Sequence, residues 1–282
     1  LANGNTVRGL NVGNTPGFFG FNGAAVGTLI IGTVNVSGTG GAINISTSGA
    51  FGSTVNFGTL ESTSSPTHNI SLVGVTGTLG VASGGAGLSG SAVNSAAVNI
   101  NGGSVNLTYP GNVTKNNAGP MVNVTGGHTG TLTFQTGTLS ATNGTGLQFN
   151  NADGTYNFNG STTLNGNGTV VNIVNGSNGT FTFGTGASSS VGNNDVAVTI
   201  DGGTAAFSYS GGITKTGNGD AIRVQGGHAT GLVVFQTGTI NVMSGNGLQF
   251  DNADSAYKFN GTTMLNGGDA AVDIINGSSG NF

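Results

Sequence analysis

The chain has 282 residues, of which 57 are glycine and only 5% are charged, and its net charge at pH 7 is −4. Lysine and arginine together number 5, too few to neutralise phosphates, so we expect no nucleic-acid partner. No apolar run approaches the roughly 18 residues of a membrane-spanning helix, so no membrane span is expected, and the absence of cysteine excludes disulfides and thiolate metal sites.

The pattern of glycine and apolar residues indicates an all-β chain. Proline numbers only 4 and glycine does not follow a period of three, which excludes a collagen triple helix. Apolar residues make up 35% of the chain on a regular spacing, which argues against disorder. No segment keeps a 3.6-residue period for three turns, so every predicted element is a strand.

The N-terminal part, residues 1–94, is the less regular one. Residues 13–26, which contain Pro16 and the pair Phe18-Phe19, predict a loose connection. Short alternating runs bounded by Gly, Ser or Asn predict strands around it at 5–12, 29–36, 42–45, 55–57 and 70–72.

From residue 95 onward an apolar–polar–apolar triplet recurs about every 25 residues. The triplets lie at 98–100, 122–124, 147–149, 171–173, 198–200, 222–224, 248–250 and 272–274. A second strand with a mostly aromatic central residue follows each triplet. A weaker third strand is predicted around Val113, Leu139, Leu164, Ile213, Ile240 and Leu265. The Gly- and Asn-rich corners between the first two strands suit the left-handed backbone that sharp turns require.

Three short strands in about 25 residues form one coil of a right-handed parallel β-helix, a β-solenoid. About eleven such coils, stacked about 4.8 Å apart, give a rod roughly 50 Å long. Apolar residues then stack in two interior columns, predicted as Ile100, Val124, Phe149 and Ile173, and as Leu107, Phe134, Phe158 and Phe183. An outward polar ladder is predicted at Asn99, Asn123, Gln148, Asn172, Thr199, Arg223, Gln249 and Asp273.

A longer repeat of four coils is superimposed on the single coil. Residues 146–181 return without a gap, and with most positions unchanged, at 247–282. The wider blocks 95–194 and 195–282 are two super-repeats offset by about 100 residues, the second of them truncated. The sequence therefore predicts one solenoid domain over 1–282, and we expect this to be a piece of a longer chain.

The run Asn-Thr-Val-Arg-Gly-Leu-Asn-Val at 5–12, followed by coils with Gly-Thr-Leu-Thr-Phe and Gly-Leu-Gln-Phe, resembles right-handed parallel β-helix repeat proteins. More narrowly, the whole chain resembles the Gly/Asn/Thr-rich "beta strand repeat" regions of large bacterial surface proteins and autotransporter-like adhesins. The resemblance implies an exported, extracellular or cell-surface fibre, and it implies no active site. We expect the rod to associate with itself or to continue as the same solenoid, and to contact a glycan or surface receptor.

Charged residues are densest on three neighbouring C-terminal coils. They are Lys215, Asp220, Arg223, Asp251, Asp254, Lys258, Asp269 and Asp273. One interpretation is a glycan- or calcium-binding patch, and the other is a set of solvated turns and outward strand positions. The first super-repeat has asparagine at the positions of Asp251, Lys258 and Asp273, so the fold does not require these charges and the second interpretation is preferred.

No other constellation predicts a metal, a cofactor or catalysis. His128 and His228 occupy equivalent corners in different super-repeats and cannot share a metal ion. Glycosidase carboxylates lie about 5–10 Å apart, whereas the equivalent Asp153 and Asp254 are four coils apart, roughly 19 Å. We therefore expect a structural or adhesive rod that is not an enzyme. A polysaccharide-processing or carbohydrate-binding β-helix is the alternative.

Overall fold

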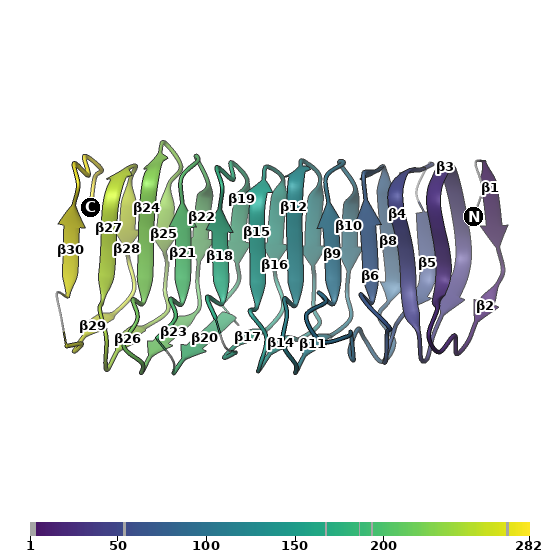
Figure 1. The fold of residues 1–282 in the computed structure, drawn as a ribbon, viewed down its shortest axis with the longest axis horizontal. Coiled ribbons are helices and arrows are strands. Elements are labelled where there is room, and N and C mark those ends of the chain that lie inside the picture. Colours follow the sequence, from purple (N-terminus) through teal and green to yellow (C-terminus); the bar gives the residue numbers. More distant parts are fainter. Residues whose placement is uncertain (1–3, 53–54, 167, 186, 193, 269–270) are drawn as a thin grey trace.

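The computed structural model describes residues 4–52, 55–166, 168–185, 187–192, 194–268 and 271–282. Its 30 strands form a rod with the two termini at opposite ends (Figure 1). The rod is a parallel β-solenoid of about 11 turns with about 24 residues per turn, so the predicted fold is confirmed. The described residues contain no helix, and hence none that is long and apolar enough to cross a membrane.

The first strand of each coil forms a continuous parallel ladder along one face of the rod (Figure 1). Its members are β3 (Phe19–Val36), β4 (Gly41–Phe51), β6 (Ile70–Val73), β9 (Val98–Asn101), β12 (Val122–His128), β15 (Leu147–Ala152), β18 (Val171–Val174), β21 (Val198–Asp201), β24 (Ile222–Ala229), β27 (Leu248–Asp254) and β30 (Val272–Ile275). All eight predicted triplets fall within this ladder.

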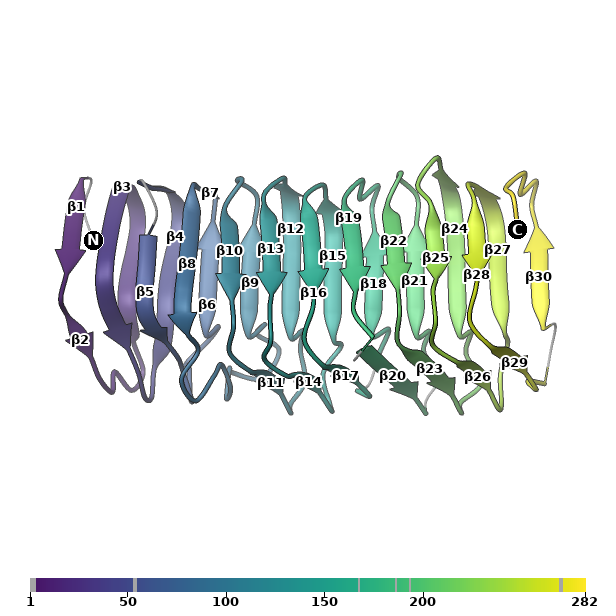
Figure 2. The same cartoon turned by 180° about the vertical axis from the view of Figure 1, so that it is seen from behind.

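The second strands form the opposite face, seen in Figure 2. They are β1 (Asn5–Arg8), β2 (Asn11–Val12), β5 (Val55–Leu60), β7 (Val75–Thr76), β8 (Thr78–Ser83), β10 (Asn106–Tyr109), β13 (Thr131–Phe134), β16 (Thr155–Phe158), β19 (Thr180–Phe183), β22 (Ala206–Tyr209), β25 (Val233–Phe235) and β28 (Tyr257–Phe259). The long strand β3 belongs to both faces, because its first half pairs with β4 and its second half with β1 and β5.

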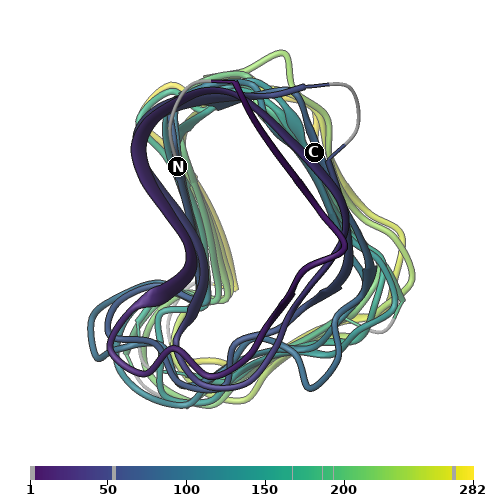
Figure 3. The ribbon, with the colours of Figure 1, turned by 90° about the vertical axis from the view of Figure 1, so that its right-hand side faces the viewer.

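The third strands form a separate parallel sheet of 7 strands. They are β11 (Val113–Lys115), β14 (Leu139–Ala141), β17 (Thr162–Leu164), β20 (Ala187–Val191), β23 (Gly212–Lys215), β26 (Ile240–Val242) and β29 (Thr263–Leu265). Six of them contain the apolar residues expected there, and β20 is a strand that the sequence did not predict. Viewed end-on, the superposed coils outline a ring with one indented side (Figure 3).

The expectation of a loose connection over 13–26 was partly wrong, because strand β3 already begins at Phe19. Phe21 and Val26 are both buried, so this segment contributes to the core. Gly27 has φ 55°, at the point where β3 passes from the first face to the second. A glycine that accepts this conformation allows one long strand to turn a corner that the sequence presents as an irregular stretch.

The interior contains two aromatic columns on the second face, where the sequence predicted one. Leu107 pairs with Leu132, and Tyr109 pairs with Phe134, so the predicted step from Leu107 to Phe134 was wrong. Each second strand has two inward positions, i and i+2, and alternation alone cannot assign an aromatic residue to one of them. In the second column Phe158 stacks on Phe183 with the ring centroids 4.7 Å apart.

The outward ladder on the first face is present in the predicted register, but its amides bond in pairs. Asn123 Nδ2 donates to Asn99 Oδ1 at 2.9 Å, and Asn172 Nδ2 donates to Gln148 Oε1 at 3.0 Å. The amide nitrogen of Gln148 instead donates to backbone carbonyls, among them Thr169 O at 2.8 Å. These bonds add side-chain contacts between coils to the backbone ladder.

Candidate functional sites

The structure brings part of the predicted charged patch together. Asp220, Arg223 and Asp251 line one depression of about 240 Å³ on the outer face of the first strands, with Gln225 and Gln249. This region of the first face carries charge in the second super-repeat only, because the equivalents of these three residues are Pro120, Asn123 and Asn150.

Two of the three charges that line this depression compensate each other. Arg223 Nε lies 2.5 Å from Asp220 Oδ2, and the Asp220 side chain is only 2% exposed. Asn246 Nδ2 donates to the second oxygen of Asp220 at 2.9 Å. Since the carboxylate is buried and both of its oxygens accept hydrogen bonds, its role here is to hold Arg223 and to link two coils.

Lys215 is buried, so it does not belong to a solvated patch. Burial lowers the pKa of its amine, and the carboxylates of Asp195 and Asp220 oppose that shift. The interpretation as solvated positions was therefore wrong for Lys215 and Asp220. Alternation within β23 places Lys215 inward with Ile213, but its charge favoured an outward position. Asp220 lies in the turn before β24, where no alternation applies.

Among the described residues, the other charged members of the predicted patch do not line the depression. Asp254 is at a corner, where its Oδ1 accepts hydrogen bonds from Ser279 N and Ser279 Oγ at 2.9 and 2.8 Å, and these bonds lower its pKa. Lys258 projects from β28 on the second face, Asp273 belongs to the outward ladder of the first face, and Asp269 lies outside the described residues.

The two corner histidines are interior residues. His128 and His228 are fully buried, and each ring nitrogen Nδ1 lies next to a tyrosine hydroxyl, that of Tyr156 at 3.2 Å and that of Tyr257 at 3.1 Å. Burial lowers the pKa of both imidazoles. Each histidine therefore belongs to the core of its own super-repeat.

Metal-binding side chains do not gather within the described residues. No group of three or more His, Asp or Glu side chains that could hold a metal ion occurs there. Tight calcium sites need six or more oxygen ligands, several of them carboxylates. The arrangement of the charged patch therefore gives no support to a calcium site.

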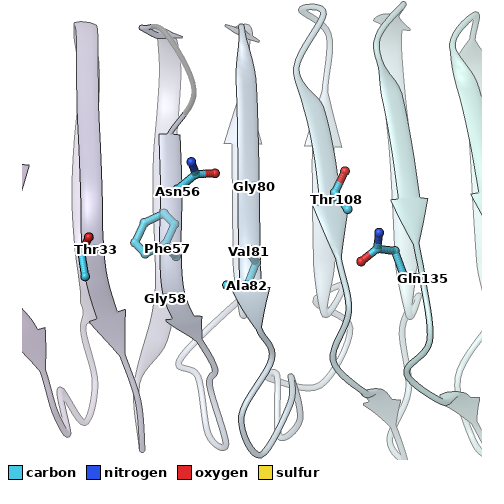
Figure 4. A pocket seen from close by; sticks show the side chains of 9 residues that line it. All are labelled: Thr33, Asn56, Phe57, Gly58, Gly80, Val81, Ala82, Thr108 and Gln135. Atoms are coloured by element: carbon cyan, nitrogen blue, oxygen red, sulfur yellow. The ribbon is translucent and has the colours of Figure 1, made fainter.

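A wide depression lies on the second face of the N-terminal coils, where the sequence predicted no site. It has a volume of about 520 Å³, and Figure 4 shows the side chains that line it on successive strands. A second depression of about 460 Å³ adjoins it, since Thr33 and Asn56 line both. We call the combined feature the notched groove, formed mainly by Arg8, Gly32, Thr33, Asn56, Gly58, Gly80, Thr108 and Gln135.

The notched groove was missed because its sequence signal is weak. It contains one charged residue and no aromatic side chain at its surface, since Phe57 is fully buried. Its glycines occur in a chain with 57 of them. Only the strand pairing shows that Gly32 and Gly80 lie on either side of Asn56 in one outward column.

Comparison of the chain with protein-family models, with curated proteins and with solved structures found no match in any of the three.

Proposed function

We propose that this chain is a structural rod of an exported bacterial surface protein that holds an adhesive surface away from the cell. The observation that carries the proposal is the unbroken parallel pairing from β3 to β30 around a filled apolar interior. Each coil covers the apolar faces of its neighbours, so coils can be added without disturbing the others. The composition, poor in charge and rich in Gly, Asn and Thr, supports an extracellular repeat fibre.

The four-coil super-repeat allows a direct test of whether the length of the rod scales with its number of coils. Deletion of residues 98–197 joins Ala97 to Val198, which restores the Ala-Val step that the native chain has at both 97–98 and 197–198. Strand β21 would then pair with β6 in place of β9. Because four coils are removed, we expect a folded rod that is shorter by about 19 Å.

Small-angle X-ray scattering of the full chain and of the deletion variant measures this difference in maximum dimension. A variant that unfolds, or one whose length does not scale with the number of coils, would contradict a modular rod. Thermal unfolding of both proteins is the control, since nearest-neighbour coil contacts should leave the midpoint close to that of the full chain.

Cleavage of polysaccharides is the competing function, and one variant distinguishes it from a structural role. Arg223 is the exposed cation of the charged depression, with its side chain 41% exposed. Cleavage of an acidic polysaccharide that is abolished by Arg223→Ala would replace the proposal with a lyase or hydrolase. We expect no cleavage, because the two oxygens of Asp220 are already occupied by Arg223 and Asn246.

A further inference from the structure

We propose that the notched groove binds an extended, uncharged polysaccharide that lies along the rod axis. This inference rests on the adhesive part of the proposed function, for which it names a ligand class and a surface. The coil-deletion experiment measures the length of the rod and not binding. A groove that binds no polysaccharide would therefore overturn this inference without contradicting the proposed rod.

Side chains and glycines alternate along one outward column of the groove. Strand pairing aligns Arg8 with Gly32, Gly32 with Asn56, Asn56 with Gly80, and Gly80 with Thr108. A side chain thus projects on every second coil, about 10 Å apart. This distance is close to the two-sugar repeat of an extended β-1,4-linked glycan, so successive repeats of the ligand would meet equivalent positions.

The backbone conformation does not require glycine at these positions. Gly32, Gly58 and Gly80 all have φ values outside the left-handed region, so other residues could adopt these conformations. A Cβ at Gly32 would have as its nearest atom the Arg8 Cγ at 3.6 Å, an ordinary contact. A glycine inside a strand weakens the strand and often marks a close approach by a ligand or another backbone. Gly32 therefore leaves a position open to solvent, whereas the amide groups of Asn35 and Asn56 lie over Gly58 and Gly80.

The polar groups of the groove are free to bind a ligand. Within the described part of the chain, the side-chain amides of Asn56 and Gln135 make no hydrogen bond, although each can both donate and accept. Gln236, the equivalent of Gln135 in the second super-repeat, donates to Ser208 Oγ at 3.4 Å and accepts from Asn260. The amide of Gln236 is therefore paired within its outward column, whereas those of Asn56 and Gln135 are not.

A strained residue lies at the centre of the groove. Thr33 is exposed, lines both halves of the groove and has φ 52°. It is the extra residue of a β-bulge, because the pairing of β3 with β5 shifts between Gly32 and Val34. A β-branched residue in this conformation is an outlier, and such strain is found preferentially at binding sites. The bulge places the Thr33 hydroxyl beside the column of alternating side chains.

The lining determines the class of polysaccharide. Arg8 is the single charge of the notched groove and lies at one end, so an acidic polymer would meet no series of cations along its length. The amides of Asn56 and Gln135 and the hydroxyls of Thr33 and Thr108 suit sugar hydroxyls, which also both donate and accept. The exposed Ala82 and the edge of Val81 provide apolar contact for the C–H faces of the sugars.

Isothermal titration of the 282-residue chain with cellohexaose and with chitohexaose tests the proposal. We expect binding of at least one of the two hexamers, and weaker binding of the corresponding dimer, which spans fewer positions. Gly32→Thr and Gly80→Thr fill the notches, and we expect each to weaken binding by at least about tenfold through steric exclusion. Both variants should keep the fold, since threonine is a good strand former at an outward strand position. A Cβ at residue 80 would approach Asn56 Oδ1 to 2.6 Å, and the end of that side chain can rotate away.

Asn157 provides the matched control, because it lies in the same outward column beyond the groove. Asn56→Ala should weaken binding several-fold, and Asn157→Ala should leave it unchanged. The proposal is overturned if neither hexamer binds at millimolar concentration, or if the glycine variants bind as well as the parent chain. It is equally overturned if only oligogalacturonate binds and Arg8→Ala abolishes that binding, because the ligand would then be acidic.

Discussion

The imidazole Nδ1 of His128 lies 3.2 Å from the hydroxyl of Tyr156, in the interior of the solenoid. The other ring nitrogen, Nε2, lies 3.0 Å from the carbonyl oxygen of Val105, so it carries the proton. The tyrosine hydroxyl accepts from the backbone N–H of Gly154 at 3.1 Å, and its own proton faces both Nδ1 and the carbonyl oxygen of His128, each 3.2 Å away. All four groups are satisfied when the histidine is neutral, and His228 and Tyr257 repeat the arrangement.

Acid should therefore destabilise the rod well above the range in which carboxylates titrate. Burial lowers the pKa of His128 and His228 from the ordinary 6.5, so the unfolded chain binds protons first as the pH falls. The free energy of unfolding is then unaffected above pH 6.5 and decreases below it. Urea unfolding at pH 5 to 8 measures this slope. In the double variant His128→Gln/His228→Gln the slope should shrink, and an unchanged slope would contradict the assignment.

Lys115 predicts a stability change at alkaline pH. Its Nζ is buried and donates to Ser91 Oγ at 3.0 Å and to Ala92 O at 2.9 Å, and burial lowers its pKa to about 8 from the ordinary 10.5. Between these two pH values the unfolded chain holds the extra proton, so the free energy of unfolding should rise with pH. Urea unfolding at pH 8 to 10 in the parent chain and in Lys115→Met measures the contribution.

The rise in the free energy of unfolding should end near pH 10. Burial raises the pKa of the interior tyrosines, that of Tyr257 to about 12 from the ordinary 10.0, so tyrosine ionisation favours the unfolded chain above pH 10. The variant Lys115→Met should show a smaller rise than the parent between pH 8 and 10, since Lys215 still contributes. A rise of equal size in both proteins would exclude Lys115 as its source.

The solenoid could be predicted from sequence because its period is short and its alternation is strict. Each triplet such as 122–124 places two apolar residues inward and one polar residue outward, and the pairing of Val124 with Ile100 and Phe149 follows from the spacing alone. The corners were predictable for the same reason. Gly126 and Gly127 have φ 71° and 73°, the conformation that the Gly-Gly pair indicated.

The candidate sites could not be predicted, because they depend on register and on corners. Lys215 takes an inward position of β23 that its charge argued against, and Asp220 is buried in the turn before β24, where the sequence has no clear period. The notched groove depends on the alignment of Gly32 with Asn56, across a bulge that shifts the register by one residue. No pattern in a single sequence reveals a shift of that kind.

A buried hydroxyl in the third sheet offers a stabilising substitution. Thr162 in β17 is fully buried, and its Oγ1 has no hydrogen-bond partner within the described residues. An unsatisfied buried hydroxyl costs free energy, so the isosteric Thr162→Val should raise the free energy of unfolding by about 1 kcal/mol. Thr131→Val at an outward position is the control and should change it by less than about 0.5 kcal/mol. Equal urea midpoints for the two variants would contradict the prediction.

The Glu61 carboxylate links three coils, so its replacement by an amide should destabilise the rod. Its Oε1 accepts from Gly38 N at 2.9 Å and its Oε2 accepts from Ala86 N at 2.6 Å. Glu61→Gln turns an NH₂ group towards one of these N–H donors, so the free energy of unfolding should fall by about 1–3 kcal/mol. Asp153→Asn is the matched control, because Asn178 donates only to its Oδ1 and an amide keeps that oxygen. Urea midpoints lowered equally in both variants would show that loss of charge, and not loss of an acceptor, determines the effect.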